Sequence, residues 1–214
     1  MSDELEAITE SAKAAQEIAK LGGKVIDAAQ NASPFINRVL GKPIEDATGL
    51  LITDPLRAAR ILTQDWYARR VTEKLRERNI REEQLKAVPP NIAVPLLEAA
   101  QDEARDELRE IWARLLTNAM DPNRSSRVRL EFIETLKQLN PLDALVLNEL
   151  VTSPNMSPNS REFLAGRLGV SRDEIVVSSQ HLVKFGCVEI STTDKGNYGV
   201  LPYGKLLLRA CEGP

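Results

Sequence analysis

Residues 161–190, REFLAGRLGVSRDEIVVSSQHLVKFGCVEI, decide the fold that this sequence predicts. Two short helical patterns meet at Gly169, which can adopt the left-handed conformation that ends a helix at little cost. Ser171 is placed to cap the second helix, and Glu174 three residues later completes a capping box. The segment therefore predicts two helices joined by a tight turn.

A β-hairpin is expected directly after these helices. Gly186 ends the second helix, and an alternating run follows it. Residues 194–197 can turn the chain into a second strand at 198–201, and Pro202 then begins a last helix. The order helix, turn, helix and hairpin predicts a winged helix-turn-helix in which the hairpin is the wing.

The second helix of this unit has an inner and an outer face. Ile175, Ser179 and Leu182 fall on the inner face at helical spacing. The outer face then carries the residues that a partner would contact, and these are Arg172, Asp173, Val176, Val177 and Gln180.

The charge of this unit favours a protein partner over DNA. DNA binding depends on Lys and Arg side chains that neutralise phosphates. Residues 140–214 hold seven Lys and Arg against eight Asp and Glu, and the outer face combines Asp173 with two adjacent valines. Exposed valines prefer an apolar partner. They could instead pack against the N-terminal half of the chain, and that alternative stays open.

Length and composition set further bounds. The 214 residues are 43% hydrophobic with a formal net charge of −3, which is ordinary for a soluble protein and points to no polyanion or anionic membrane. Two cysteines, Cys187 and Cys211, fit a reducing compartment. The acidic N-terminus resembles no signal or transit peptide, and no stretch approaches the ~20 apolar residues of a membrane span. We therefore expect a cytoplasmic protein.

The N-terminal part predicts a helical bundle. An amphipathic helix is expected over residues 3–21, ended by Gly22-Gly23, and a short helix from Lys24 is expected to end in a break at 31–34. The apolar stretch 35–52 could form two short buried helices. Alternatively, it could be a surface segment that meets a membrane, which would make the protein a membrane-acting toxin.

Two helical regions follow. Asp54-Pro55 starts a helix to about Asn79 with one basic face. Residues 91–120 predict two helices or one kinked helix, and one side of them carries carboxylates at intervals of four: Glu98, Asp102, Asp106 and Glu110. Such a strip can bind a metal, but with arginines nearby it is more simply a solvated or salt-bridged face, against the basic helix for example.

A domain border is expected near Asn140-Pro141, where a cap-then-proline pair starts another helix. The predicted domains are a helical bundle at 1–139 and a winged helix at 140–214. The fold class is thus mainly α.

Enzymatic motifs are missing from the sequence. The single histidine, His181, is expected at the surface or edge of its helix, and a nucleophile with a histidine base would depend on it alone. No glycine-rich phosphate loop is present. We expect a protein that is not an enzyme, with no catalytic, cofactor-binding or metal-binding residues.

Several segments together resemble the Abi-alpha (abortive infection alpha) family of bacterial proteins. They are DPLRAARIL (54–62), VPLLEAAQDEARDELREIWARLLTNAMDP (94–122), FIETLKQLNPLDALVLNEL (132–150) and YGVLPYGKLLLRAC (198–211), within a resemblance that spans roughly 37–211. Six residues match its motif, although packing, helix termination and capping explain them equally well: Trp112, Asn118, Asp121, Pro122, Pro141 and Asp143.

The resemblance implies phage exclusion, in which the infected cell stops growing or dies before phage matures. We expect a non-enzymatic defence protein that acts through contacts with a host or phage protein, or with another copy of itself. A DNA-binding transcriptional regulator and a membrane-acting toxin are the alternatives. Aspartate at both Val176 and Val177 is expected to abolish function and leave helicity intact.

Overall fold

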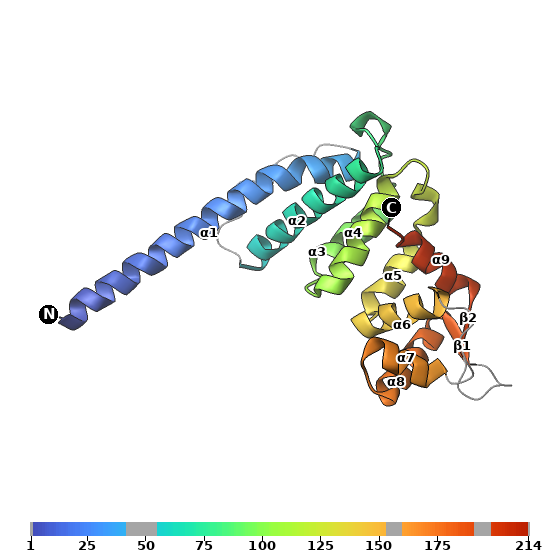
Figure 1. Cartoon of the computed structure of the whole chain (residues 1–214). Helices are drawn as coiled ribbons and strands as arrows, with labels where there is room; N and C mark the ends of the chain where they lie inside the picture. The colour runs from blue at the N-terminus through green and yellow to red at the C-terminus, as the bar shows by residue number, and fades with distance from the viewer. Residues whose placement is uncertain (1, 42–54, 153–159, 191–197, 214) are drawn as a thin grey trace.

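The computed structural model describes residues 2–41, 55–152, 160–190 and 198–213 (Figure 1). These residues form a mainly helical protein with a small antiparallel hairpin near the C-terminus, as predicted. The described α-helices are α1 (Ser2–Leu40), α2 (Pro55–Glu77), α3 (Pro90–Gln101), α4 (Asp106–Met120), α5 (Leu130–Gln138), α6 (Pro141–Thr152), α7 (Ser160–Leu168), α8 (Arg172–Lys184) and α9 (Pro202–Ala210). The short 3-10 helices are η1 (Glu82–Gln84) and η2 (Ser125–Arg127), and the strands are β1 (Val188–Ile190) and β2 (Tyr198–Val200).

Helix α1 is continuous, which corrects the prediction of two helices and a break. It runs through Gly22-Gly23 and contains Pro34 in its interior. Its C-terminal half packs along α2, where Val25 and Ala28 form a small buried cluster with Ile61. This packing outweighs the low helix propensity of the two glycines, about 1 kcal/mol each, and of Pro34, about 3 kcal/mol. The apolar stretch 35–52 begins inside α1, and residues 42–54 lie outside the described residues.

Two carboxylates of the predicted strip, Asp102 and Glu110, pair with the basic helix α2, as the sequence suggested, whereas Glu98 and Asp106 are exposed. Arg60 Nε lies 2.9 Å from Asp102 Oδ1. Arg70 Nε lies 2.9 Å from Glu110 Oε2, and Lys74 Nζ lies 2.5 Å from the other oxygen of the same carboxylate. The Glu110 contacts hold α2 against α4, and the Asp102 contact joins α2 to the end of α3.

The contacts of Glu110 are expected to make the stability of the fold depend on pH in the acidic range. Burial by itself raises the pKa of Glu110, but hydrogen bonds from Arg70 and Lys74 outweigh this effect and lower the pKa to about 2 from its ordinary 4.5. Because its pKa is lower in the folded state, the ionised Glu110 carboxylate stabilises the fold. This stabilisation is fully present above pH 4.5 and is lost as the pH falls from 4.5 towards 2. Urea unfolding of Glu110→Gln should therefore show a smaller loss of stability on acidification than the unmodified chain. Equal acid dependence in the two proteins would contradict this assignment, and Glu134→Gln, at an exposed ion pair, is the matched control.

The C-terminal part packs three helices against the hairpin. Helix α8 contacts α6, α7 and β1, and the strands pair with Val188 opposite Val200. The turn predicted at 194–197 lies outside the described residues. Gly204 at the start of α9 lies so close to the strand that a Cβ there would meet the Cys187 carbonyl oxygen at 2.4 Å. A side chain at this position would force α9 away from β1.

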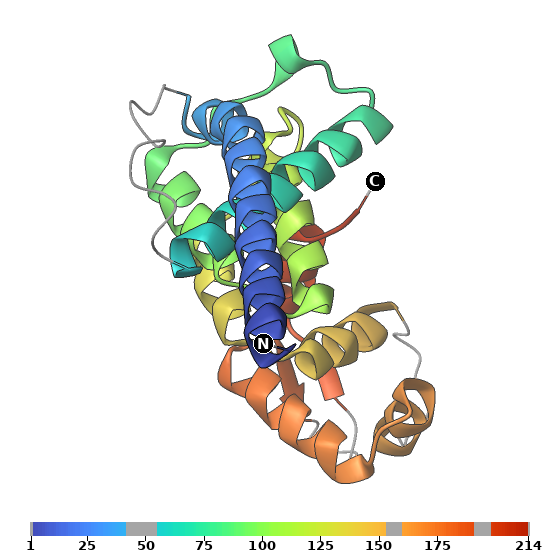
Figure 2. The same cartoon turned by 90° about the vertical axis from the view of Figure 1, so that its left-hand side faces the viewer.

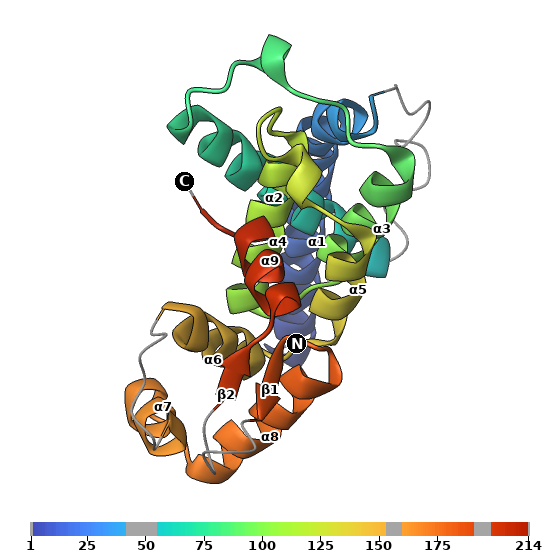
Figure 3. The ribbon, with the colours of Figure 1, turned by 90° about the vertical axis from the view of Figure 1, so that its right-hand side faces the viewer.

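A single large cluster of buried apolar side chains extends from α1 to α9. Trp112, Leu115 and Leu116 of α4 are at most 1% exposed and lie within it, as the apolar stripe predicted. Figures 2 and 3 show α9 beside α4 and the α6–α8 group at one end of the molecule. The cluster contains residues from both sides of Asn140, and the predicted border there stays a prediction.

Candidate functional site

Helix α8 is held in register by its N-terminal cap and its buried face. The Ser171 Oγ accepts a hydrogen bond from the Glu174 backbone N–H at 3.2 Å, and the Ser171 backbone N–H donates to Glu174 Oε2 at 2.8 Å. Gly169 before it adopts a positive φ of 68°, as the turn requires. Ile175 and Leu182 are fully buried. The predicted capping box, turn and inner face are all confirmed.

The opposite face of α8, which we call the α8 surface, consists of the predicted partner-contact residues. Arg172, Asp173, Val177 and Gln180 are exposed, and Val176 is half-buried. Val177 is 65% exposed, the largest fraction of any large apolar side chain in the described residues. The alternative that Val177 packs against the N-terminal helices is therefore wrong, and Figures 1 and 3 show α8 far from α2.

The α8 surface is not cationic. Arg172 Nη1 lies 2.9 Å from Glu162 Oε1 of α7, so its charge is shared with a carboxylate. Asp173 and Glu174 add negative charge at the helix start, where the helix dipole favours it. No arginine-rich patch of α2 is brought to this surface, because the described contacts of α8 are with α6, α7 and β1. Its chemistry suits an apolar or basic partner better than a phosphate backbone.

A buried polar cluster behind the α8 surface joins α8 to α6. Asp143 is 2% exposed, and its Oδ1 accepts a hydrogen bond from Ser178 Oγ at 2.7 Å. Its Oδ2 lies 2.7 Å from His181 Nδ1 and accepts a bond from the Asn140 backbone N–H at 2.8 Å. The sequence indicated the helix-capping bond but not the contacts with Ser178 and His181. Ser178 and His181 are three residues apart and therefore share one side of α8, next to the inward Leu182. This spacing was the signal in the sequence that both could contact one partner.

A second polar cluster joins α2, α4 and the C-terminal residues. Asn118 is fully buried; its Nδ2 donates to the Ala210 carbonyl at 2.7 Å, and its Oδ1 accepts from Arg78 Nη1 at 2.6 Å. The same Arg78 nitrogen lies 3.1 Å from Asp121 Oδ2. Burial is the largest influence on the pKa of Arg78 and lowers it, but a guanidinium keeps its charge in proteins. Two of the motif residues are thus tied to the end of α9.

The other motif residues lie in different surroundings. Trp112 is 1% exposed within the apolar core. Pro122 is exposed just after α4, and Pro141 is the first residue of α6. The structure therefore does not gather the six motif residues into one site.

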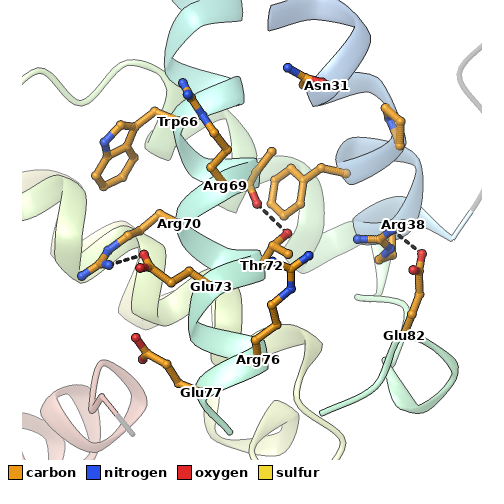
Figure 4. Close-up of a pocket in the computed structure, with 13 residues that line it drawn as sticks. Asn31, Arg38, Trp66, Arg69, Arg70, Thr72, Glu73, Arg76, Glu77 and Glu82 are labelled. Carbon is orange, nitrogen blue, oxygen red and sulfur yellow. Dashed lines mark hydrogen bonds and ion pairs between the residues drawn. The ribbon is translucent and has the colours of Figure 1, made fainter. Parts of the chain in front are cut away.

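A groove of about 1030 Å³ lies between the C-terminal part of α1 and α2 (Figure 4). Its lining mixes cations and carboxylates, and Figure 4 shows Arg38 against Glu82 and Arg70 against Glu73. The second pair lies at 2.5 Å. Four arginines and three glutamates of the described residues line the groove, so its charge is nearly balanced and favours neither an anion nor a cation.

A metal site and a membrane span are both absent from the residues that the structure describes. Among the described residues, no group of three or more His, Cys, Asp or Glu side chains is placed to hold a metal ion. None of the described helices combines the length and the apolar content that crossing a bilayer requires.

The described residues define a mainly helical protein that presents an acidic and apolar helix surface above a buried polar cluster. Residues 59–211 match the family model described as abortive infection alpha. The protein belongs to the abortive infection alpha family, and this membership indicates a role in abortive infection defence. The matched region begins later than residue 37, where the sequence resemblance was expected to start. Neither the curated proteins nor the solved structures gave a significant match to this chain.

Proposed function

We propose that this chain is a non-enzymatic, cytoplasmic protein of bacterial anti-phage defence, and that it binds another protein through the α8 surface. The observation that carries the proposal is the 65% exposure of Val177, with Asp173 exposed beside it, on a helix fixed firmly to its neighbours. A rigid helix that presents an apolar side chain loses little conformational entropy on binding, which favours a specific contact.

The proposal interprets residues 140–214 as a winged helix domain carried by a helical bundle at 1–139. Support comes from the order α6, α7, α8, β1 and β2, with the turn at Gly169 between α7 and α8. In this interpretation α8 occupies the position of a recognition helix. The acidic residues at the start of α8 and its valines favour binding of a protein over binding of nucleic acid at this helix.

The polar clusters support a protein that is not an enzyme. Ser178 and His181 both contact the carboxylate of Asp143, whereas a nucleophilic serine must contact the histidine that takes its proton. Burial raises the pKa of Cys187 to about 11 and that of Cys211 to about 12, so neither thiol is an activated nucleophile. The buried clusters are better explained as contacts that position α8 and the end of α9.

The test is a phage challenge of bacteria that express the chain or its variants. The unmodified chain should lower the plating efficiency of at least one phage in a panel, and Val177→Asp should return it to the level of cells without the protein. Val176 is half-buried, so replacing it as well could disturb the fold. Val177→Asp alone therefore tests the surface more directly than the double substitution. Val177→Asp should change the unfolding free energy by no more than ~0.5 kcal/mol, because the side chain is exposed.

Val94→Asp is the matched control, because Val94 is 44% exposed on α3. It introduces the same charge on another surface and should keep full protection. Protection that survives Val177→Asp would overturn the α8 proposal. A salt-dependent mobility shift of random duplex DNA, abolished by the same variant, would favour the DNA-binding alternative.

A further inference from the structure

The N-terminal half of α1 extends from the body of the molecule as an arm (Figure 1). The C-terminal half of this helix packs on α2, and Val25 is the first buried residue among the α1 side chains that the structure describes. Before that point the described side chains of α1, which include Lys13, Gln16, Ala19, Lys20 and Leu21, are exposed, apart from the half-buried Gly22. Isolated helices of this length are marginal in water and are normally stabilised by packing.

The sequence of the arm carries a heptad pattern. Apolar or small residues recur at alternating spacings of three and four, and they are Leu5, Ile8, Ala12, Ala15, Ala19, Gly22 and Ile26. A repeat of 3.5 residues produces a continuous stripe along a helix that faces a second helix in a coiled coil. Ala19 and Ile26, two described members of the stripe, are exposed, so at this end the stripe lies off the face that packs on α2.

Residue size along the stripe selects an antiparallel partner. In an antiparallel pair centred between residues 13 and 14, Leu5 faces Gly22 of the other copy and Ile8 faces Ala19. Each large side chain is thus matched by a small one, as close helix packing requires. A parallel pair would instead place Leu5 on Leu5 and leave Gly22 on Gly22.

Charge along the arm selects the same arrangement. Residues 3–10 hold four carboxylates and no Lys or Arg, whereas residues 13–24 hold three lysines and one glutamate. An antiparallel pair brings the acidic segment of each copy beside the basic segment of the other. A parallel pair would superimpose the acidic segments, and like charges in that position are destabilising.

The glycines of the arm are a separate observation. Gly22 and Gly23 lie inside the helix, where each costs about 1 kcal/mol relative to alanine. A Cβ added at either glycine would meet nothing within 4 Å in this chain, so internal packing gives no reason for glycine here. The close approach of a second helix backbone would explain a glycine at position 22, because Gly22 lies on the stripe.

We propose that two copies of this chain associate through an antiparallel pairing of residues 3–24 of α1. The paired segment is about 33 Å long. The proposal does not depend on the function of the α8 surface, which lies elsewhere on the molecule (Figure 1).

The first experiment measures the mass of the full-length chain by sedimentation over a range of micromolar concentrations. The unmodified chain should be a dimer, and Ala15→Glu, on the stripe, should be a monomer with unchanged helicity by circular dichroism. Ala14→Glu is the matched control, because it places the same charge about 100° around the helix, off the stripe. It should remain a dimer. A monomeric unmodified chain, a dimeric Ala15→Glu or a monomeric Ala14→Glu would each overturn the proposal.

A second experiment tests the direction of the pair. The variant Ile8→Cys with Ala19→Cys should form a disulfide-linked dimer under mild oxidation, because these positions face each other across the pair. Ile8→Cys alone should not, since the two copies of residue 8 are about 16 Å apart along the axis. Efficient linking by Ile8→Cys alone would show a parallel pair and overturn the arrangement. The unmodified chain, whose own cysteines are buried, is the background control.

Discussion

Replacing Arg78 with methionine is expected to lower the free energy of unfolding by about 3 kcal/mol, at the lower end of the range for breaking a buried ion pair. The Arg78 side chain is 7% exposed and that of Asp121 is 4% exposed. Without the guanidinium, the Asp121 carboxylate and the Asn118 carbonyl oxygen lose a hydrogen-bond donor in a region with little water. The Asn123 backbone N–H still donates to Asp121, which keeps the loss from being larger. Urea unfolding followed by circular dichroism measures the effect.

Arg60→Met, on α2, is the control for loss of an arginine. Its side chain is 49% exposed and that of its partner Asp102 is 55% exposed, so the loss of this ion pair is expected to cost less than ~1 kcal/mol. The double variant Arg78→Met with Asp121→Asn should recover part of the stability, because it removes the uncompensated charge. A destabilisation by Arg78→Met no larger than that by Arg60→Met would show that the cluster contributes little to the fold.

Replacing Asp143 with alanine is expected to cost about 2–4 kcal/mol, because Ser178, His181 and the Asn140 N–H all lose their shared acceptor. Each buried donor left without a partner carries a desolvation penalty, and the penalties within one cluster do not add exactly. Helix α8 should also be less firmly held to α6. Thermal and urea unfolding give the energy, and hydrogen exchange of the α8 amides reports the loosening.

Asp106→Ala is the control, since that carboxylate is 90% exposed at the start of α4. It should change stability by less than ~1 kcal/mol. The conservative Asp143→Asn should fall between the unmodified chain and Asp143→Ala, because an amide oxygen still accepts hydrogen bonds. If Asp143→Ala left both stability and α8 exchange unchanged, the cluster would not be what positions the α8 surface.

Local rules explain what the sequence predicted well. The turn at Gly169, the cap at Ser171 and the start of α6 at Pro141 each depend on residues within a few positions of one another. Their conformations follow from backbone sterics and local hydrogen bonds, which are the same in any protein. The charge pairing of α2 with α4 was also predictable, because a basic face needs counter-charges nearby.

Long-range contacts explain what the sequence did not predict. The glycine pair and Pro34 looked like helix ends, but α2 packs along α1 and keeps the helix continuous beyond them. Asp143 meets His181 across 38 positions and Asn118 meets Ala210 across 92. A single sequence indicates that such polar residues need partners but not which ones, because the partner is set by how helices dock.

The tie between Asn118 and the Ala210 carbonyl also bears on how the protein is made. A ribosome delivers α4 well before α9, so in a nascent chain the Asn118 side-chain N–H cannot yet reach its final acceptor, the Ala210 carbonyl. The apolar surface awaiting Leu207 and Ala210 stays open for the same interval. Completion of the core is thereby postponed to the last stage of translation, when α9 docks on α4.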